Sequence, residues 1–173
     1  GALKGPSIMP GGSKKAWSSV KPIFQKIAAH TDNDEPCCEW VGENGAGHFV
    51  KMVHNGIEYV EMQLLAELYA LMSVEMTHKE IADVFKAWNQ VELSSYLLGI
   101  TTEILSKKEG ETYLLDLIVD KAGNKGTGSW SSKAAFDLGI PNTMMSGAVF
   151  ARYISSFKES RERFSNLPSA IKQ

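Results

Sequence analysis

The sequence predicts a mainly α-helical protein with a short strand–helix–strand segment in front of it. Apolar residues recur at helical spacing almost throughout residues 45–173, whereas short apolar runs bounded by turn residues flank one helical stretch in residues 1–44. Two strands do not form a stable sheet by themselves. We therefore expect residues 1–44 to be the end of a larger α/β unit and residues 45–173 to belong to a helical domain.

The first 44 residues are expected to contain two strands and one helix. Residues 7–9 form an apolar run that ends at Pro10-Gly11-Gly12, the pattern of a strand stopped by a turn. Ser13 is a suitable N-cap for a helix that continues to about His30. A second strand is predicted over residues 38–41.

The helices of the second part are predicted from caps and apolar spacing. A Gly-Ala-Gly sequence at residues 45–47 opens a long helix to about Met76, and Thr77 with Glu80 has the capping-box pattern for the next helix. Three further helices are expected over residues 92–107, 113–121 and 132–138, the last capped by Ser132. Pro141 suits the first turn of a final helix that reaches about Phe164.

Composition and charge exclude several classes of protein. The 173 residues carry a formal net charge of −2, without the run of Lys and Arg that binds nucleic acid or an anionic membrane. No apolar stretch approaches the roughly 20 residues that span a bilayer. Cys37 and Cys38 are adjacent, which disfavours a disulfide between them, and two thiols do not complete a zinc site. These features favour a reduced, cytoplasmic protein with no nucleic-acid, membrane or metal partner.

Residues 45–59 contain the pattern that is most informative about function. If this stretch is a helix, five polar residues at positions i, i+3, i+4, i+7 and i+8 share one face: Lys51, His54, Asn55, Glu58 and Tyr59. The other positions are mostly apolar, so we expect a helix that is buried on most sides and carries this one polar seam. Half-burial would disfavour the charged forms of Lys51 and Glu58 and make them a candidate base and acid. A solvated helix face is the alternative interpretation.

A second candidate site is the glycine-rich stretch over residues 122–130. Its Lys125-Gly126-Thr127-Gly128 sequence combines an ammonium, a hydroxyl and backbone N–H groups, which suits a phosphate or carboxylate. An ordinary flexible connection is the alternative. Arg152 is a single cation in an apolar helical stretch, where a snorkelling or paired structural role is the competing interpretation.

Taken together, these motifs resemble the decarboxylating 6-phosphogluconate dehydrogenase family. The resemblance runs in order along nearly the whole chain, through residues 5–12, 35–42, 45–59, 88–89, 122–130 and 147–152. The wider β-hydroxyacid dehydrogenase group is similar only in Gly45-x-Gly47-x-x-x-Lys51-x-x-x-Asn55. The additional His54, Glu58-Tyr59 and Lys-Gly-Thr-Gly residues point to the phosphogluconate branch.

The resemblance implies a fold, a reaction and roles for residues. Residues 1–44 would be the end of a Rossmann-like NADP-binding domain, and residues 45–173 the first part of an all-helical substrate and dimerisation domain. The implied reaction is oxidative decarboxylation of 6-phosphogluconate to ribulose 5-phosphate, with reduction of NADP, by a cytoplasmic homodimer of the pentose phosphate pathway. Lys51 would be the general base and Glu58 the acid. The substrate would be held by His54, Asn55, Tyr59, Lys125, Thr127 and Arg152.

Parts of the family pattern lie outside this sequence. The dinucleotide fingerprint, a Ser-Gly-Gly segment and a C-terminal tail are not found in it, and residue 1 is Gly rather than Met. We therefore expect a fragment that neither binds NADP tightly nor turns over by itself, and its cofactor-binding residues stay unassigned. Two alternatives remain open: a sibling hydroxyacid dehydrogenase with an unphosphorylated substrate, and a helical module without catalytic activity.

Overall fold

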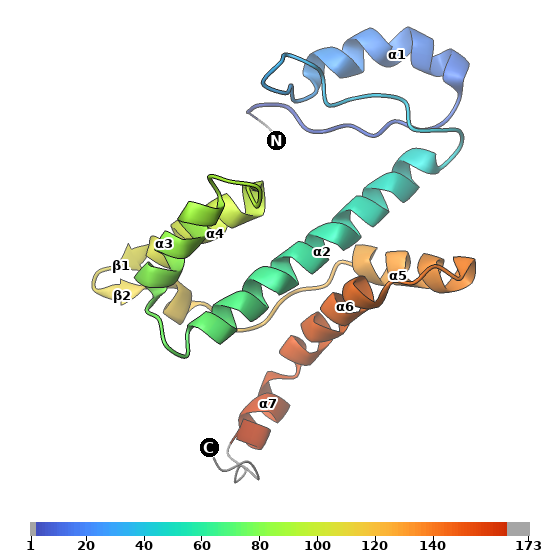
Figure 1. Cartoon of the computed structure of the whole chain (residues 1–173). Coiled ribbons are helices and arrows are strands. Elements are labelled where there is room, and N and C mark those ends of the chain that lie inside the picture. Colours follow the sequence, from blue (N-terminus) through green and yellow to red (C-terminus); the bar gives the residue numbers. More distant parts are fainter. Residues whose placement is uncertain (1–2, 166–173) are drawn as a thin grey trace. The chain divides into compact units, whose positions relative to one another are not determined.

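A computed structural model describes residues 3–165 (Figure 1). The chain divides into two compact units. Unit 1 comprises residues 1–56 and unit 2 residues 57–173. The long helix α2 (Ala46–Met72) begins in unit 1 and ends in unit 2. The mainly helical fold class is confirmed. The domain boundary at residues 44 and 45 stays a prediction, and residues 166–173 of the predicted helical domain lie outside the described residues.

Helix α1 (Lys14–Ile27) forms the body of unit 1. Ser13 caps it as predicted, because its Oγ accepts a hydrogen bond from the Ala16 N–H at 3.3 Å. The helix ends at Ile27 instead of His30. Its apolar face packs into a small cluster of buried and half-buried residues: Trp17, Ala28, Cys38, Ile8, Val20, Phe24 and Trp40.

The two segments predicted as strands in unit 1 lie parallel to each other. The Ile8 N–H donates to Cys37 O at 2.9 Å, and the Gly12 N–H donates to Gly42 O at 3.0 Å. These pairings are isolated parallel bridges rather than regular strands, so the strand prediction holds only for the extended backbone and its pairing. Parallel segments joined by a helix have the βαβ connectivity expected at the end of an α/β unit.

Helix α2 begins close to its predicted start but is shorter than predicted. It ends at Met72 instead of Met76, because the Met76 N–H and its neighbours form turns that lead into the next helix. Near its start, Gly47 is in close contact with the backbone at Met9, and a side chain at this position would overlap Met9 O. Glycine is therefore required for α2 to begin against the first extended segment of unit 1.

Helices α3 (His78–Trp88) and α4 (Tyr96–Ser106) pack against each other and form the main core of unit 2. The predicted capping box is present, since Thr77 Oγ1 accepts from the Glu80 N–H at 3.3 Å and Glu80 Oε2 accepts from the Thr77 N–H at 2.8 Å. Helix α4 begins four residues later than predicted, because Ser95 caps it. The buried members of this core are Ile81, Ala82, Phe85, Leu98 and Leu105.

The helix predicted over residues 113–121 is wrong. A small antiparallel hairpin of β1 (Lys108–Glu109) and β2 (Thr112–Tyr113) is followed by one 3-10 turn, η1 (Leu114–Leu117). Gly110 has φ +61°, a left-handed conformation that glycine adopts at little cost, and it reverses the chain between the two strands. The hairpin therefore places residues 112–113 in a strand, and residues 114–117 form only a short 3-10 helix.

The last three helices differ from the prediction at their ends. Helix α5 (Thr127–Leu138) begins five residues before Ser132, whose Oγ donates to Gly128 O at 3.1 Å inside the helix instead of capping it. The single helix predicted from Pro141 to Phe164 is split into α6 (Thr143–Ser156) and α7 (Lys158–Ser165). The backbone of Phe157 leaves the helical conformation with ψ 50°, and this interrupts the helix. Among the described residues, no helix combines the length and apolar character needed to cross a membrane.

Candidate functional site

The polar seam predicted from the sequence lies on one continuous helix, α2. Lys51 and His54 are exposed, and Lys51 Nζ lies 3.1 Å from His54 Nδ1. Asn55 and Glu58 are half-buried, while Tyr59 is buried with 8% of its surface exposed. Exposure therefore falls along the seam from its lysine end to its tyrosine end.

The expectation that α2 is buried on most sides is wrong for the chain described. Phe49 and Ile57 are 46% and 58% exposed, and Lys51 is exposed rather than half-buried. The described residues pack against only part of the helix, so several of its apolar side chains are left at the surface. Lys51 is therefore accessible at the surface, with His54 as its neighbour on the seam.

Asn55 has one feature that the sequence did not reveal. Its side-chain oxygen is buried, and no donor among the described residues reaches it. A buried acceptor without a donor costs free energy, so such a group calls for a partner that the described residues do not supply.

Tyr59 is the point of unit 2 at which α5 and α6 contact α2. Its ring packs with Ala148 and Val149 of α6 in one buried cluster. Gly128 lies against it from the first turn of α5, where an added Cβ would be 2.8 Å from Tyr59 Cδ2 and 2.7 Å from Val149 Cγ2. The start of α5 can approach this closely only because residue 128 has no side chain.

Arg152 lies over the same ring. Its guanidinium carbon is 3.8 Å from the centre of the Tyr59 ring, a cation–π contact. Its Nη1 donates to Gly123 O at 2.6 Å, and its Nη2 lies 3.6 Å from Met62 Sδ. Arg152 is therefore paired with the glycine-rich stretch rather than pointing freely into solvent, and the two candidate features adjoin each other.

The glycine-rich stretch opens helix α5. Gly126 has φ +101° and occupies the N-cap position, and its N–H donates to Asn124 Oδ1 at 2.8 Å. Thr127 begins the helix, so its backbone N–H belongs to the first turn, where N–H groups lack partners within the helix and attract anions. Lys125, two positions before Thr127, is exposed. An ammonium, a helix N-terminus and the Arg152 guanidinium are thus carried by neighbouring segments of unit 2.

Several residues that support this arrangement were missed by the sequence analysis. Asp120 accepts hydrogen bonds from Arg161 and Lys158, which hold the pKa of its carboxyl well below its usual range. Ser155 accepts from the Ala122 N–H at 3.0 Å. These pairs join positions 33 to 41 residues apart in the chain, so no local pattern in the sequence could have revealed them.

Comparisons with known proteins show the family to which the chain belongs. The family profile of the 6-phosphogluconate dehydrogenase C-terminal domain matches residues 47–173, and that of the NAD binding domain of 6-phosphogluconate dehydrogenase matches residues 1–42. The chain belongs to the 6-phosphogluconate dehydrogenase family. The resemblance stated from the sequence motifs is therefore confirmed.

Individual relatives in the 6-phosphogluconate dehydrogenase family are similar over nearly the whole chain. The decarboxylating 6-phosphogluconate dehydrogenases of Raoultella terrigena and of Escherichia coli K12 are each 56% identical to it over 164 residues. These matches cover 93% of this chain but 37% and 35% of the two relatives. The chain thus spans little more than a third of the length of the curated relatives it matches.

A solved structure of a 6-phosphogluconate dehydrogenase shares the fold. The Plasmodium falciparum protein, described in apo form, with its cofactor NADP+ and with its substrate 6-phosphogluconate, is 44% identical and superposes with a TM-score of 0.90. The match covers all of this chain and 38% of that one. The helical fold described above is therefore the fold of the corresponding part of a 6-phosphogluconate dehydrogenase.

Proposed function

We propose that this chain belongs to an enzyme that oxidatively decarboxylates 6-phosphogluconate to ribulose 5-phosphate and CO2, with reduction of NADP. The observation that carries the proposal is the meeting of Tyr59, Arg152 and the start of α5 in unit 2. A cation stacked on a tyrosine beside a helix N-terminus suits a phosphate dianion. Family membership supplies the reaction that such a phosphate-bearing substrate undergoes.

The phosphate end of the substrate is assigned to Tyr59, Lys125, Thr127 and Arg152. Arg152 offers a planar fork of donors, and the Thr127 hydroxyl and N–H lie at the first turn of α5. Tyr59 contributes its hydroxyl while its ring supports the guanidinium. The sugar hydroxyls are assigned to His54 and Asn55, and the lone acceptor on Asn55 supports this role because a hydroxyl is a hydrogen-bond donor.

Lys51 and Glu58 are proposed as the base and the acid of the reaction. Lys51 in its neutral form takes the proton of the 3-hydroxyl while the hydride of C3 leaves, which gives a 3-keto acid. Protonated Lys51 then assists at the carbonyl oxygen while CO2 departs and an enediol forms. Glu58 delivers a proton to the enediol carbon to give ribulose 5-phosphate. The hydrogen-bond distance between Lys51 and His54 supports the base role, because an imidazole can hold a lysine amine in place.

The described residues fit one edge of a dinucleotide site. The parallel segments of unit 1 end at glycines, and a Cβ added at Gly12 or Gly45 would meet open space. Cofactors in open α/β sheets bind outside the carboxyl ends of parallel strands. Residues 10–12 and 42–45 are therefore the ones that would border NADP, whose nicotinamide supplies the hydride acceptor when bound.

A cytoplasmic homodimer is the proposed form of the enzyme. Large apolar side chains stay at the surface along several helices, including Ile57 at 58% and Phe136 at 80% exposed. Exposed apolar surface of this extent is typical of protein–protein contacts. Sedimentation analysis of the protein expressed from the open reading frame that contains this sequence tests the assembly, and a monomer would contradict it.

The test of the proposed function is a substrate assay on that same protein. We expect NADP reduction that depends on 6-phosphogluconate, release of one CO2 per NADPH, and ribulose 5-phosphate as product. Unphosphorylated gluconate should be a poor substrate, because it lacks the group that Arg152 and Thr127 are proposed to bind. Equal turnover of the two compounds would favour a sibling hydroxyacid dehydrogenase instead.

A further inference from the structure

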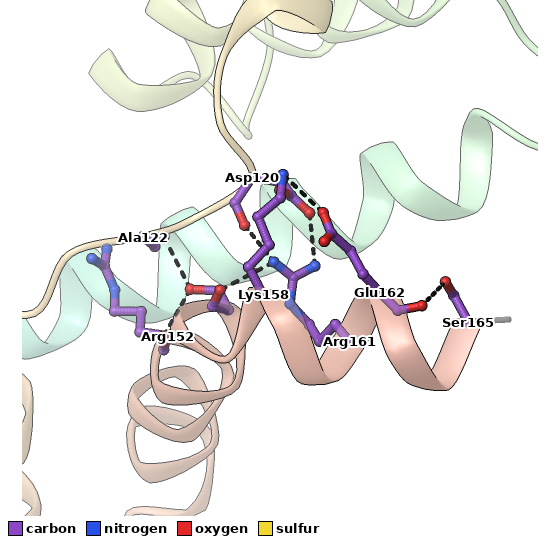
Figure 2. Close-up of polar contacts among 8 residues, drawn as sticks. Asp120, Ala122, Arg152, Lys158, Arg161, Glu162 and Ser165 are labelled. Carbon is purple, nitrogen blue, oxygen red and sulfur yellow. Dashed lines mark hydrogen bonds and ion pairs between the residues drawn. The ribbon is translucent and has the colours of Figure 1, made fainter.

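A cluster of ion pairs lies outside the candidate site and joins α7 to the segment in front of the glycine-rich stretch (Figure 2). Asp120 is at its centre. One carboxylate oxygen accepts from Lys158 Nζ at 2.6 Å, and the other accepts from Arg161 Nη1 at 2.7 Å. Arg161 Nη2 also donates to the backbone oxygen of Asp120 at 2.8 Å. Asp120, Lys158 and Arg161 are called the Asp120 clamp below.

The clamp is connected to Arg152 through Ser155. Arg161 Nη2 also donates to Ser155 O at 3.1 Å, and Ser155 Oγ donates to Arg152 O at 2.7 Å. The same Ser155 Oγ accepts from the Ala122 N–H at 3.0 Å. Figure 2 shows the Arg152 backbone, Ala122 and the clamp joined by these hydrogen bonds. The end of α6 and residues 120–122 are thus held together at two successive points.

A third attachment follows one residue later. Gly123 O accepts a hydrogen bond from Arg152 Nη1. The side chain of Arg152 therefore adds a third contact to those made by its backbone and by the clamp. Residues 120–123 are therefore fixed to α6 and α7 on the side that precedes Lys125 and Thr127. A displacement of Asp120 would move both the loop that carries these residues and the carbonyl that orients Arg152.

Both cations of the clamp engage the single Asp120 carboxylate, and Lys158 also lies 3.6 Å from Glu162 Oε1. The Asp120 carboxylate engages both Lys158 and Arg161, so these two cations are committed to Asp120 and not offered to a bound anion. Arg161 is bidentate to Asp120 through a carboxylate oxygen and a backbone oxygen, a geometry that a lysine could not reproduce. The cluster therefore fixes the position of residue 120 relative to α7, and other residues bind the substrate.

We propose that Asp120 is a positioning residue for the substrate phosphate: through Arg161 and Ser155 it holds the glycine-rich stretch and Arg152 in the relative placement that binds the phosphate group. This inference rests on the proposed function of Arg152 and Thr127. Placement errors of about 1 Å in such a site cost up to about a hundredfold in rate or affinity.

The experiment compares Asp120→Asn and Arg161→Lys with the unchanged protein, each expressed from the open reading frame that contains this sequence. Asp83→Asn is the matched control, because Asp83 forms an ion pair with Lys79 at 2.7 Å and its side chain is 63% exposed, against 58% for Asp120. The readouts are kcat, the KM for 6-phosphogluconate, and inhibition constants of inorganic phosphate and of gluconate. Thermal denaturation reports whether each variant is folded.

A positioning role predicts a selective effect at the phosphate end of the substrate. For both clamp variants the KM for 6-phosphogluconate and the inhibition constant of phosphate should rise about tenfold, while that of gluconate changes by less than about twofold. The control should match the unchanged protein. Equal weakening of phosphate and gluconate, or no change in either, would overturn the inference and leave the proposed function intact.

Failure of the proposed function would be seen separately. If the unchanged protein does not oxidise 6-phosphogluconate, calorimetric titration with inorganic phosphate decides the inference by itself. Phosphate binding that weakens about tenfold in Asp120→Asn and not in Asp83→Asn would still support the positioning role. Absence of phosphate binding to the unchanged protein would overturn it.

Discussion

The guanidinium carbon of Arg152 lies 3.8 Å from the centre of the Tyr59 ring, and the two residues are 93 positions apart in the sequence. This contact joins the polar seam of α2 to the glycine-rich stretch, because Arg152 also binds Gly123 O and Gly128 packs against the same ring. Two motifs that are separate in the sequence therefore share a single buried tyrosine.

The first prediction separates the two roles of Tyr59. Tyr59→Phe keeps the ring under Arg152 and should change the free energy of unfolding by less than about 1 kcal/mol, whereas Tyr59→Ala leaves a cavity and should cost about 3–5 kcal/mol. Urea denaturation measures both. In the enzyme assay Tyr59→Phe should raise the KM for 6-phosphogluconate, because the hydroxyl assigned to the phosphate is lost. An unchanged KM would remove Tyr59 from the phosphate site.

The second prediction concerns Gly128. A methyl group at this position would lie within 2.9 Å of Tyr59 and Val149 atoms, so Gly128→Ala should destabilise unit 2 by about 1–3 kcal/mol. Gly147→Ala is the control, because the added Cβ meets nothing within 4 Å on helix α6 and should stabilise by roughly 0.5–1 kcal/mol. Melting temperatures that move in opposite directions would fit this packing, and a stabilised Gly128→Ala would contradict it.

The third prediction concerns the acid dependence of the Asp120 clamp. Hydrogen bonds from Arg161 and Lys158 lower the pKa of Asp120 in the folded protein, so its carboxylate stabilises the fold above the ordinary pKa of an aspartate, and this stabilisation is lost as pH falls below that value. The urea midpoints of the unchanged protein and Asp120→Asn should differ by a constant amount at neutral pH. The difference should shrink below about pH 4. A difference that grows on acidification would contradict the assignment.

The fourth prediction concerns the cap of α4. Ser95 Oγ accepts from the Leu98 N–H at 3.1 Å and donates to Glu61 at 2.6 Å, so Ser95→Ala should cost about 1–2 kcal/mol. Ser94→Ala is the matched control, since Ser94 is exposed and precedes the cap. Denaturation midpoints that fall equally in the two variants would show that Ser95 has no special role.

The sequence revealed features whose cause is local. Ser13 and the Thr77–Glu80 capping box were predicted correctly, because a cap depends on residues three positions apart. Ser132 shows the limit of this reasoning. Serine is a residue type that often caps helices, but close packing of Gly128 against Tyr59 allows α5 to begin before Ser132. Exposure along the seam, and with it the surface position of Lys51, depends on what packs against α2 and could not be inferred from its spacing.

Features set by distant partners could not be predicted at all. Asp120 looked like one more charged residue within a predicted helix, although it pairs with Arg161 across 41 positions. The break at Phe157 that separates α6 from α7 brings Lys158 and Arg161 to this aspartate. Motif resemblance identified the candidate site residues, whereas the contacts that hold them in place came only from the structure.

The most direct test of the proposed activity is the rate of NADPH formation with 6-phosphogluconate, measured for the protein that contains this chain and for its Lys51→Ala variant. General-base catalysis typically contributes a factor of about 10² to 10⁴. We expect robust NADPH formation by the unchanged protein and a loss of at least about a hundredfold in kcat for Lys51→Ala, with the affinity for 6-phosphogluconate measured by calorimetry kept within a few-fold. Near-normal turnover by Lys51→Ala, or no NADPH formation by the unchanged protein, would contradict the account.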